Sequence, residues 1–462
     1  MSAARQPLSW IFAALFLLGL FGPVWAAGRV ETHTLANGLR IFVKEDHRAP
    51  VVVSQVWYRA GSMDEHNGAT GVAHVLEHMM FKGTRQVPAG EFSRLIAAAG
   101  GRENAFTSRD YTAYFQTLQK DRLALAFRLE ADRMANLVLS EQEFAKEIEV
   151  VRNERRWRTE DKPQSLVYEA LMATAFQASP YRWPVIGWMN DLDNMTVADA
   201  RAWYRRWYAP NNAALVVVGD VKAREVFQLA QRYFGSIRAR PLPGRKPQLE
   251  PEQTGPRRVT VKAPAKLPYL IMAWHAPVLK DPEQDWEPYA LEMLAGVLDA
   301  NAAARFPARL VRESRVAVEA GASYDSVQRG PGLFLVDGTP SEGRTVQDLE
   351  AAIRAELARI QEEGVGEDEL SRIRAQLIAA QVYQRDSMFY QAMQIGEVVT
   401  VGFDPSLVER RIEKLKAVTT EQVQAVARKY LLDDHLTVAT LDPQPLTARK
   451  PATPPKGLRH VQ

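Results

Sequence analysis

Two histidines and a glutamate within five residues are the part of this sequence best suited to chemistry. The segment H-V-L-E-H contains His74, Glu77 and His78. In a helix, residues four apart lie on one face, so His74 and His78 can grip one metal ion while Glu77 projects from the neighbouring edge. Two imidazoles and a carboxylate are what a hydrolytic zinc site takes from one helix. The order H-x-x-E-H therefore predicts a zinc-dependent hydrolase.

A catalytic zinc ion also needs a third protein ligand and one open position for water. Ser140, followed three residues later by Glu143, has the pattern of a capping box and predicts a second helix. That helix carries Glu147 and Glu154, which are seven residues apart and so lie on one face. Either glutamate can point at the motif helix, and either can equally be an ordinary exposed residue. Spacing alone leaves both candidates open.

The elements around these residues follow from hydrophobic periodicity. Gly83 is expected just past the last turn of the motif helix, in left-handed backbone. Strands are expected at residues 30–45 (with a turn at Asn37 and Gly38), 50–59, 104–115 and 213–220, and helices at residues 91–99, 123–137 and 144–160. A mixed arrangement of this kind predicts an α+β fold.

The chain also contains an internal repeat. Residues 196–208 match residues 419–431, and the same offset carries Leu215 onto Val438. We therefore expect two homologous halves, each a sheet packed with helices. The expected boundaries are an N-terminal catalytic domain at residues 28–237, a Pro- and Arg-rich linker at 238–257, a C-terminal domain at 258–442 and a disordered tail at 443–462. The second half has no H-x-x-E-H, so it is predicted to be inactive.

The N-terminus and the composition bound the class of protein. Arg5, an apolar run at residues 10–21 and small residues before Ala26 predict a signal peptide at residues 1–26, cleaved near Ala26, and hence an exported, periplasmic protein; a retained anchor is the alternative. No later stretch is apolar and long enough to cross a bilayer, so the mature chain is expected to be soluble. A net charge of +3 gives no sign of nucleic-acid binding. Because the chain has no cysteine, zinc must be held by histidine and carboxylate.

Three further stretches carry a resemblance to a known family. After the motif come M-M-F-K-G-T at residues 79–84, N-A-F-T at 104–107 and E-I-E-V-V-R-N-E at 147–154. Together with H-V-L-E-H they resemble the pitrilysin/insulinase family of zinc metallopeptidases, the inverzincins, and most of all its mitochondrial-processing-peptidase-like bacterial branch. The likeness covers about residues 31–442. It implies two halves arranged as a clam-like shell.

The resemblance also implies roles for the candidate site residues. Glu154 becomes the third ligand of one Zn²⁺ ion, beside His74 and His78, and Glu147 a carboxylate that orients a ligand. Glu77 then takes the proton of the water activated at the metal and delivers it to the leaving amine. The expected function is an endopeptidase that hydrolyses peptides or unfolded polypeptides. The alternative is a non-catalytic peptide-binding or scaffold subunit, which would have no use for Glu77.

Substrate contacts and a partner follow from the same resemblance. Residues Asn104, Ala105, Phe106 and Thr107 resemble an edge strand to which an extended peptide adds, although an ordinary strand would look the same. The family's inactive half supplies an arginine and a tyrosine to the substrate. Arg305 stands at the arginine position and Val318 at the tyrosine position, and valine has no hydrogen-bond donor. We therefore expect a heterodimer with a homologous, zinc-free subunit that carries the complete pair.

Overall fold

The structure is a computed structural model that describes residues 29–446. The expected signal peptide and most of the expected tail lie outside the described residues. Among those that are described, no helix combines the length and apolar character that crossing a bilayer requires.

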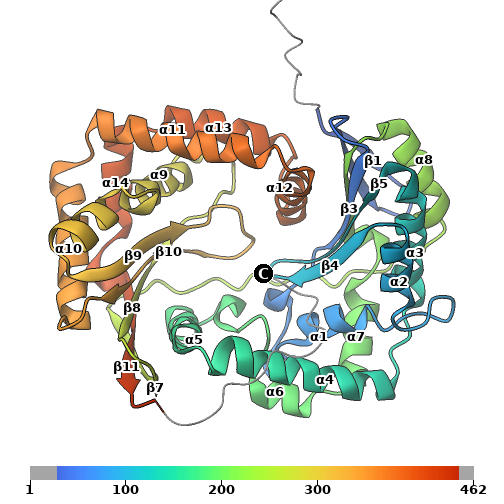
Figure 1. Ribbon diagram of the computed structural model, residues 1–462, viewed down its shortest axis with the longest axis horizontal. Coiled ribbons are helices and arrows are strands. Elements are labelled where there is room, and N and C mark those ends of the chain that lie inside the picture. Colours follow the sequence, from blue (N-terminus) through green and yellow to red (C-terminus); the bar gives the residue numbers. More distant parts are fainter. Residues whose placement is uncertain (1–28, 447–462) are drawn as a thin grey trace, which may run out of the picture.

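The first half of the chain builds a six-stranded sheet and its helices (Figure 1). Its strands are β1 (Glu31–Thr34), β2 (Arg40–Glu45), β3 (Val51–Tyr58), β4 (Arg102–Thr107), β5 (Thr112–Gln119) and β6 (Ala213–Gly219). Its helices are α1 (Val72–Met79), α2 (Glu91–Ala98), α3 (Leu123–Asn136), α4 (Glu141–Arg155), α5 (Pro163–Ala175), α6 (Met189–Asn194), α7 (Val197–Trp207) and α8 (Ala223–Phe234).

The second half builds a five-stranded sheet and longer helices. Its strands are β7 (Arg257–Pro264), β8 (Tyr269–Ala276), β9 (Ala317–Tyr324), β10 (Gly332–Pro340) and β11 (Leu436–Gln444). Its helices are α9 (Glu287–Asp299), α10 (Val346–Glu363), α11 (Glu367–Gln384), α12 (Met388–Val401), α13 (Leu407–Ala417) and α14 (Thr420–Tyr430).

The two sheets share one topology. The first has the order β1-β2-β6-β3-β5-β4 and the second β7-β11-β8-β10-β9. The five strands β2-β6-β3-β5-β4 of the first sheet correspond in order to β7-β11-β8-β10-β9 of the second. In each set the first two strands, β2 with β6 and β7 with β11, are parallel, and the remaining neighbours are antiparallel. The predicted α+β fold of two homologous halves is confirmed. The repeat seen in the sequence corresponds to α7–β6 and α14–β11.

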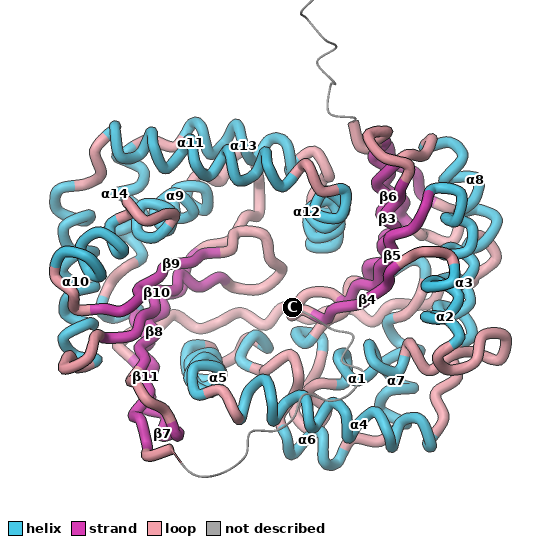
Figure 2. Tube along the Cα trace, viewed as in Figure 1, coloured by secondary structure: helices cyan, strands magenta, loops and turns pink. Residues whose placement is uncertain are grey.

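Each half also lends a helix to the other half's sheet (Figure 2). Helix α12 covers one face of the first sheet, with Met388, Ala392, Ile395 and Val399 in one apolar cluster with residues of β3 and β6. Helix α5 covers the second sheet in the same way, with Val167, Leu171 and Ala175 against residues of β8 and β11. The other face of each sheet carries the half's own core. Because each sheet is covered on one face by a helix of the other half, the two halves share apolar clusters and pack together.

Gly396 of α12 packs closely against Trp57 of β3 at the interface between the two halves. A Cβ at Gly396 would fall 2.0 Å from the indole Cε2, on a side chain that is fully buried. We expect Gly396→Ala to destabilise the chain by about 2 kcal/mol, because overpacking costs about 3 kcal/mol and helix propensity returns about 1. Urea unfolding followed by tryptophan fluorescence measures this. Gly255→Ala, where a Cβ meets nothing within 4 Å, is the control, and an equal loss there would contradict the packing argument.

The structure corrects four expectations. Residues 104–115 form two strands rather than one, because Ser108 and Asp110 lie in a tight turn between β4 and β5. Gly83 has the expected positive φ of 92°, but the motif helix ends at Met79, and Gly83 instead pairs with Pro88 in a bridge. Strand β7 begins within the expected linker, at residue 257, and β11 continues two residues into the expected tail.

Candidate active site

The helix that carries the motif is α1, and all eight of its residues are buried. Gly71 precedes its first residue, and its φ of 86° and lack of side chain let the chain pass the carbonyl of Ile186, 2.6 Å from where a Cβ would lie. Glycine has no side chain that could accept a first-turn amide, and the Glu65 carboxylate instead accepts hydrogen bonds from the amides of Gly71 and Ala73, both at 2.8 Å. Burial raises the pKa of Glu65 to about 8. This contact fixes the start of the motif helix.

The second helix of the site is α4. Its N-terminus is capped as predicted on the serine side, since Ser140 Oγ accepts the amide of Glu143 at 3.2 Å. The helix continues into a π-helical segment, Arg156–Glu160, that leads to α5. Helix α4 packs on α1, and both candidate glutamates point toward it.

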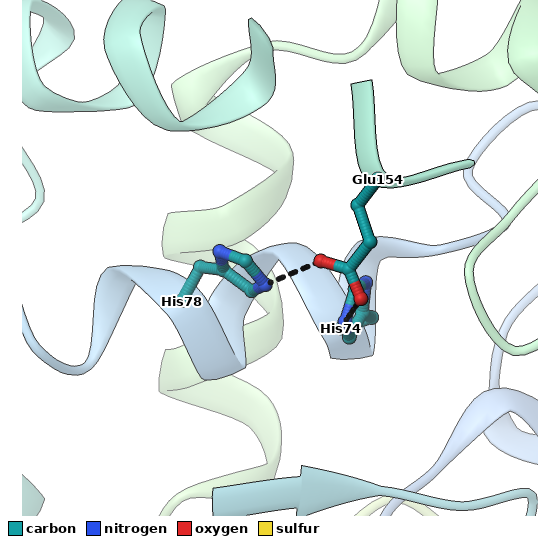
Figure 3. Close-up of side chains that lie close together, drawn as sticks. All are labelled: His74, His78 and Glu154. Carbon is teal, nitrogen blue, oxygen red and sulfur yellow. Dashed lines mark ion pairs between the residues drawn. The ribbon is translucent and has the colours of Figure 1, made fainter. Parts of the chain in front are cut away.

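His74, His78 and Glu154 come together as a cluster of three ligand atoms (Figure 3). Glu154 Oε1 lies 3.8 Å from His74 Nε2, and Glu154 Oε2 lies 3.4 Å from His78 Nε2. All three side chains are buried, and one ligand atom from each lies within 4.8 Å of the others. Ligands of a tetrahedral zinc ion lie roughly 3.4 Å apart, so a small inward shift of these side chains fits the ion.

The charges around this cluster favour a cation. Burial alone would raise the pKa of Glu154, but the neighbouring His74, His78 and Arg158 lower it to about 2. Burial alone would lower the pKa of His78, but the carboxylates of Glu147, Glu154 and Glu77 raise it to about 9. The pocket thus holds an ionised carboxylate and stabilises positive charge on an imidazole. The donor set and its electrostatics both suit a divalent zinc ion.

Glu147 lies behind His78 rather than at the cluster. Its Oε2 is 3.2 Å from His78 Nδ1, and its Oε1 is 2.5 Å from Lys82 Nζ. Although burial opposes ionisation, these two partners lower the pKa of Glu147. A carboxylate on Nδ1 fixes the ring so that Nε2 faces the metal position. The two glutamates that spacing could not tell apart therefore differ in position: Glu154 lies among the metal-ligand atoms, and Glu147 contacts the far side of the His78 ring.

We expect Glu147→Gln to weaken zinc binding by about 10- to 100-fold, because the amide holds the His78 ring less firmly and removes one negative charge. Competition against a zinc-sensitive dye measures the affinity. Glu149→Gln is the matched control, since Glu149 lies on the same helix but is exposed and pairs with Arg152. Equal affinities of the two variants would contradict this role.

Glu77 faces the edge strand of the first sheet. Its carboxylate is buried and accepts a hydrogen bond from the Thr107 hydroxyl, at the end of β4. Strand β4 is one of the two edge strands of its sheet, in line with what the family resemblance implied. A cavity of about 1240 Å³ runs along it, and its walls include His74, Glu154, Ala105, Phe106 and Thr107. Asn104 is the one residue of the predicted substrate segment that does not line this cavity.

Arg305 is not brought to this cavity. It is buried in the second half, where its guanidinium donates to Glu356 at 3.2 Å, to Glu369 at 2.9 Å and to the carbonyl of Gly364 at 3.1 Å. Because Arg305 already binds two carboxylates, it links α10 to α11 and is not available as a donor to the substrate. Val318 lies on β9, one of the two edge strands of the second sheet, and is exposed.

Two acids that position α1, Glu65 and Asp191, are not among the site residues predicted from the sequence. Glu65 binds the amides of the helix start, and Asp191 accepts hydrogen bonds from the Gly68 amide and from the amide and hydroxyl of Thr70. The sequence contains only an indirect sign of such an acid. A buried helix that begins at Gly71 lacks a capping side chain, so an acid from elsewhere has to supply the acceptor.

Two family models match successive parts of the chain. The model described as insulinase (peptidase family M16) matches residues 40–187, which include both H-x-x-E-H and Glu154. The model described as the peptidase M16 inactive domain matches residues 194–377, most of which belong to the half without the motif.

Individual proteins extend the likeness over nearly the whole chain. Zinc protease PqqE of Helicobacter pylori is 31% identical over 421 residues, which cover 89% of this chain and 93% of that protein. A probable mitochondrial-processing peptidase subunit beta of Arabidopsis thaliana is 26% identical, over 92% of this chain and 81% of that protein. The crystal structure of a protease from Helicobacter pylori superposes with a TM-score of 0.85 at 29% identity, covering 90% of this chain and all of that one. The chain belongs to the insulinase (M16) family of zinc metallopeptidases.

Proposed function

We propose that this chain is a zinc-dependent endopeptidase that hydrolyses peptides or unfolded polypeptides. The observation that carries the proposal is the placement of four side chains. His74, His78 and Glu154 present three ligand atoms to one point, and Glu77 stands beside them at the end of an edge strand. A scaffold subunit has no use for this last carboxylate.

The residues divide the reaction among them. His74, His78 and Glu154 would hold one Zn²⁺ ion, with Glu147 orienting His78. When bound, the ion polarises the scissile carbonyl and makes a water molecule more acidic. Glu77 accepts the proton of the attacking water and passes it to the leaving amine. Thr107 orients the Glu77 carboxylate, and the outer edge of β4 holds the peptide as an added strand.

We propose further that a homologous, zinc-free subunit completes the site. Within this chain, Val318 cannot donate a hydrogen bond, and Arg305 is committed to Glu356 and Glu369. Two donors for the substrate or the oxyanion are therefore expected from a partner. We also propose that residues 1–26 are an export signal and that the complex acts in the periplasm. Fractionation of cells that express the tagged chain tests that location.

The test of the function is peptide hydrolysis by the purified chain, alone and mixed with a homologue that lacks H-x-x-E-H. We expect hydrolysis of unfolded polypeptides that a chelator abolishes and added zinc restores, with a higher rate in the mixture. Hydrolysis that never appears in either sample would favour the scaffold alternative. Full activity of the chain alone would exclude the need for a partner.

A further inference from the structure

Arg109 lies in the wall of the catalytic cavity and has no carboxylate partner among the residues that the structure describes. Arg109 lies in the turn that follows β4, two residues beyond Thr107, and its side chain lines the same cavity as His74 and Glu154. Its guanidinium is held between aromatic rings, with its carbon 5.9 Å from the centre of Tyr168 and 5.6 Å from that of Tyr181. Nη2 donates to the Tyr168 hydroxyl at 3.0 Å.

The remaining N–H groups of Arg109 have no acceptor within residues 29–446, and over the same range Arg109 forms no ion pair. The neighbouring Asp110 is already engaged, because it accepts from the Tyr181 hydroxyl at 2.6 Å and from the Arg329 amide at 3.0 Å. Other arginines near this wall do have acceptors. Arg155 binds Glu169, Arg158 binds Glu154, and Arg182 donates to the carbonyl of Gln177.

The backbone around Arg109 is fixed. The carbonyls of Ser108 and Arg109 accept the amides of Ser62 and Met63 at 3.1 and 2.9 Å. The cost of withdrawing an arginine from water is normally offset by an anion, and two aromatic faces and one hydroxyl offset it only partly. A guanidinium held in this way is arranged in advance to bind a carboxylate through two parallel hydrogen bonds.

From this geometry we propose that Arg109 binds a carboxylate of the peptide substrate. A peptide added along β4 passes Thr107 and Glu77 and then meets Arg109. The carboxylate belongs either to an aspartate or glutamate near the scissile bond or to the C-terminus of a short peptide. This inference rests on the proposed peptidase function and makes the chain selective for substrates that carry negative charge close to the cleaved bond.

The test uses the zinc-loaded full chain, with its partner subunit if the partner proves necessary. One series of quenched fluorescent peptides carries Glu, Gln or Lys in turn at each position around the scissile bond. A second series has the same neutral sequence with a free or an amidated C-terminus. We expect kcat/KM for the preferred carboxylate peptide to exceed that of its neutral counterpart by about 10- to 100-fold. The series in which this preference appears identifies the source of the carboxylate.

Arg109→Gln should abolish this preference while leaving the turnover of neutral peptides within about threefold of wild type. Tyr168→Phe, which keeps the ring but loses its hydroxyl, should reduce the preference without abolishing it. Thermal unfolding shows whether each variant folds. If Arg109→Gln does not fold, Tyr168→Phe still tests the proposal. Arg182→Gln is the matched control, because Arg182 lines the same cavity but donates to a backbone carbonyl.

Two outcomes would overturn the inference. One is equal cleavage of charged and neutral peptides by the wild-type chain. The other is an equal loss of preference in Arg109→Gln and Arg182→Gln, which would indicate a general positive potential instead of a binding site. Both differ from failure of the proposed function, in which the wild-type chain cleaves no peptide of either series.

Discussion

Replacing Glu77 with glutamine should lower kcat by about 10³-fold or more while leaving one zinc ion bound per chain. Glutamine keeps the shape of the side chain, and its amide oxygen can still accept the hydrogen bond of Thr107. It cannot take a proton from water. Because Glu77 is not one of the three clustered ligands, the metal should stay. Single-turnover peptide cleavage and elemental analysis of zinc measure the two properties on the same sample.

The expected separation of zinc content from activity distinguishes a base from a ligand. Thr107→Val removes the hydroxyl that orients Glu77 but no ionisable group, so we expect a loss of roughly tenfold, again with zinc retained. Wild-type turnover in Glu77→Gln would show that another group takes the proton. Loss of zinc in that variant would instead make Glu77 part of the metal site.

The local part of this site was accessible from the sequence. The spacing of His74 and His78 fixes their common face once the segment is helical. The capped start at Ser140 predicts a second helix, and the seven-residue spacing of Glu147 and Glu154 puts them on one face of it. The choice between those two glutamates needed either a family resemblance or coordinates. Which glutamate reaches the histidine ligand atoms depends on how α4 packs across α1. That packing is set by contacts between elements far apart in the chain.

Hydrophobic periodicity could not predict the contacts between the two halves. An apolar stripe on α12 or α5 indicates burial but not the sheet that buries it, and here each helix covers the sheet of the other half. Arg305 shows the same limit. Its place in a matching motif suggested a substrate contact, but the carboxylates that bind it come from α10 and α11, more than 50 residues later. The lack of a carboxylate partner for Arg109 within residues 29–446 is likewise visible only in the folded structure.

Replacing Glu154 with glutamine should weaken zinc binding by more than about 100-fold and remove activity with it. The carboxylate is fully buried, and its two oxygens face His74 and His78. A neutral amide is a poorer ligand for Zn²⁺, and it also removes the negative charge that offsets the ion. The loss should exceed that of Glu147→Gln, because Glu147 acts on the metal only through the His78 ring. Dye competition ranks the two variants on one scale.

The same substitution separates zinc binding from folding. Glu154 also pairs with Arg158, so its removal leaves a cation facing two histidines in a buried site, and the metal-free variant should be less stable than the metal-free wild type. Zinc should raise the thermal midpoint of the wild type and of Glu149→Gln but not that of Glu154→Gln, since stabilisation by a ligand follows its affinity for the folded state. An equal zinc-induced shift in all three proteins would place the third ligand elsewhere. In that case the cluster of His74, His78 and Glu154 would not be the metal site.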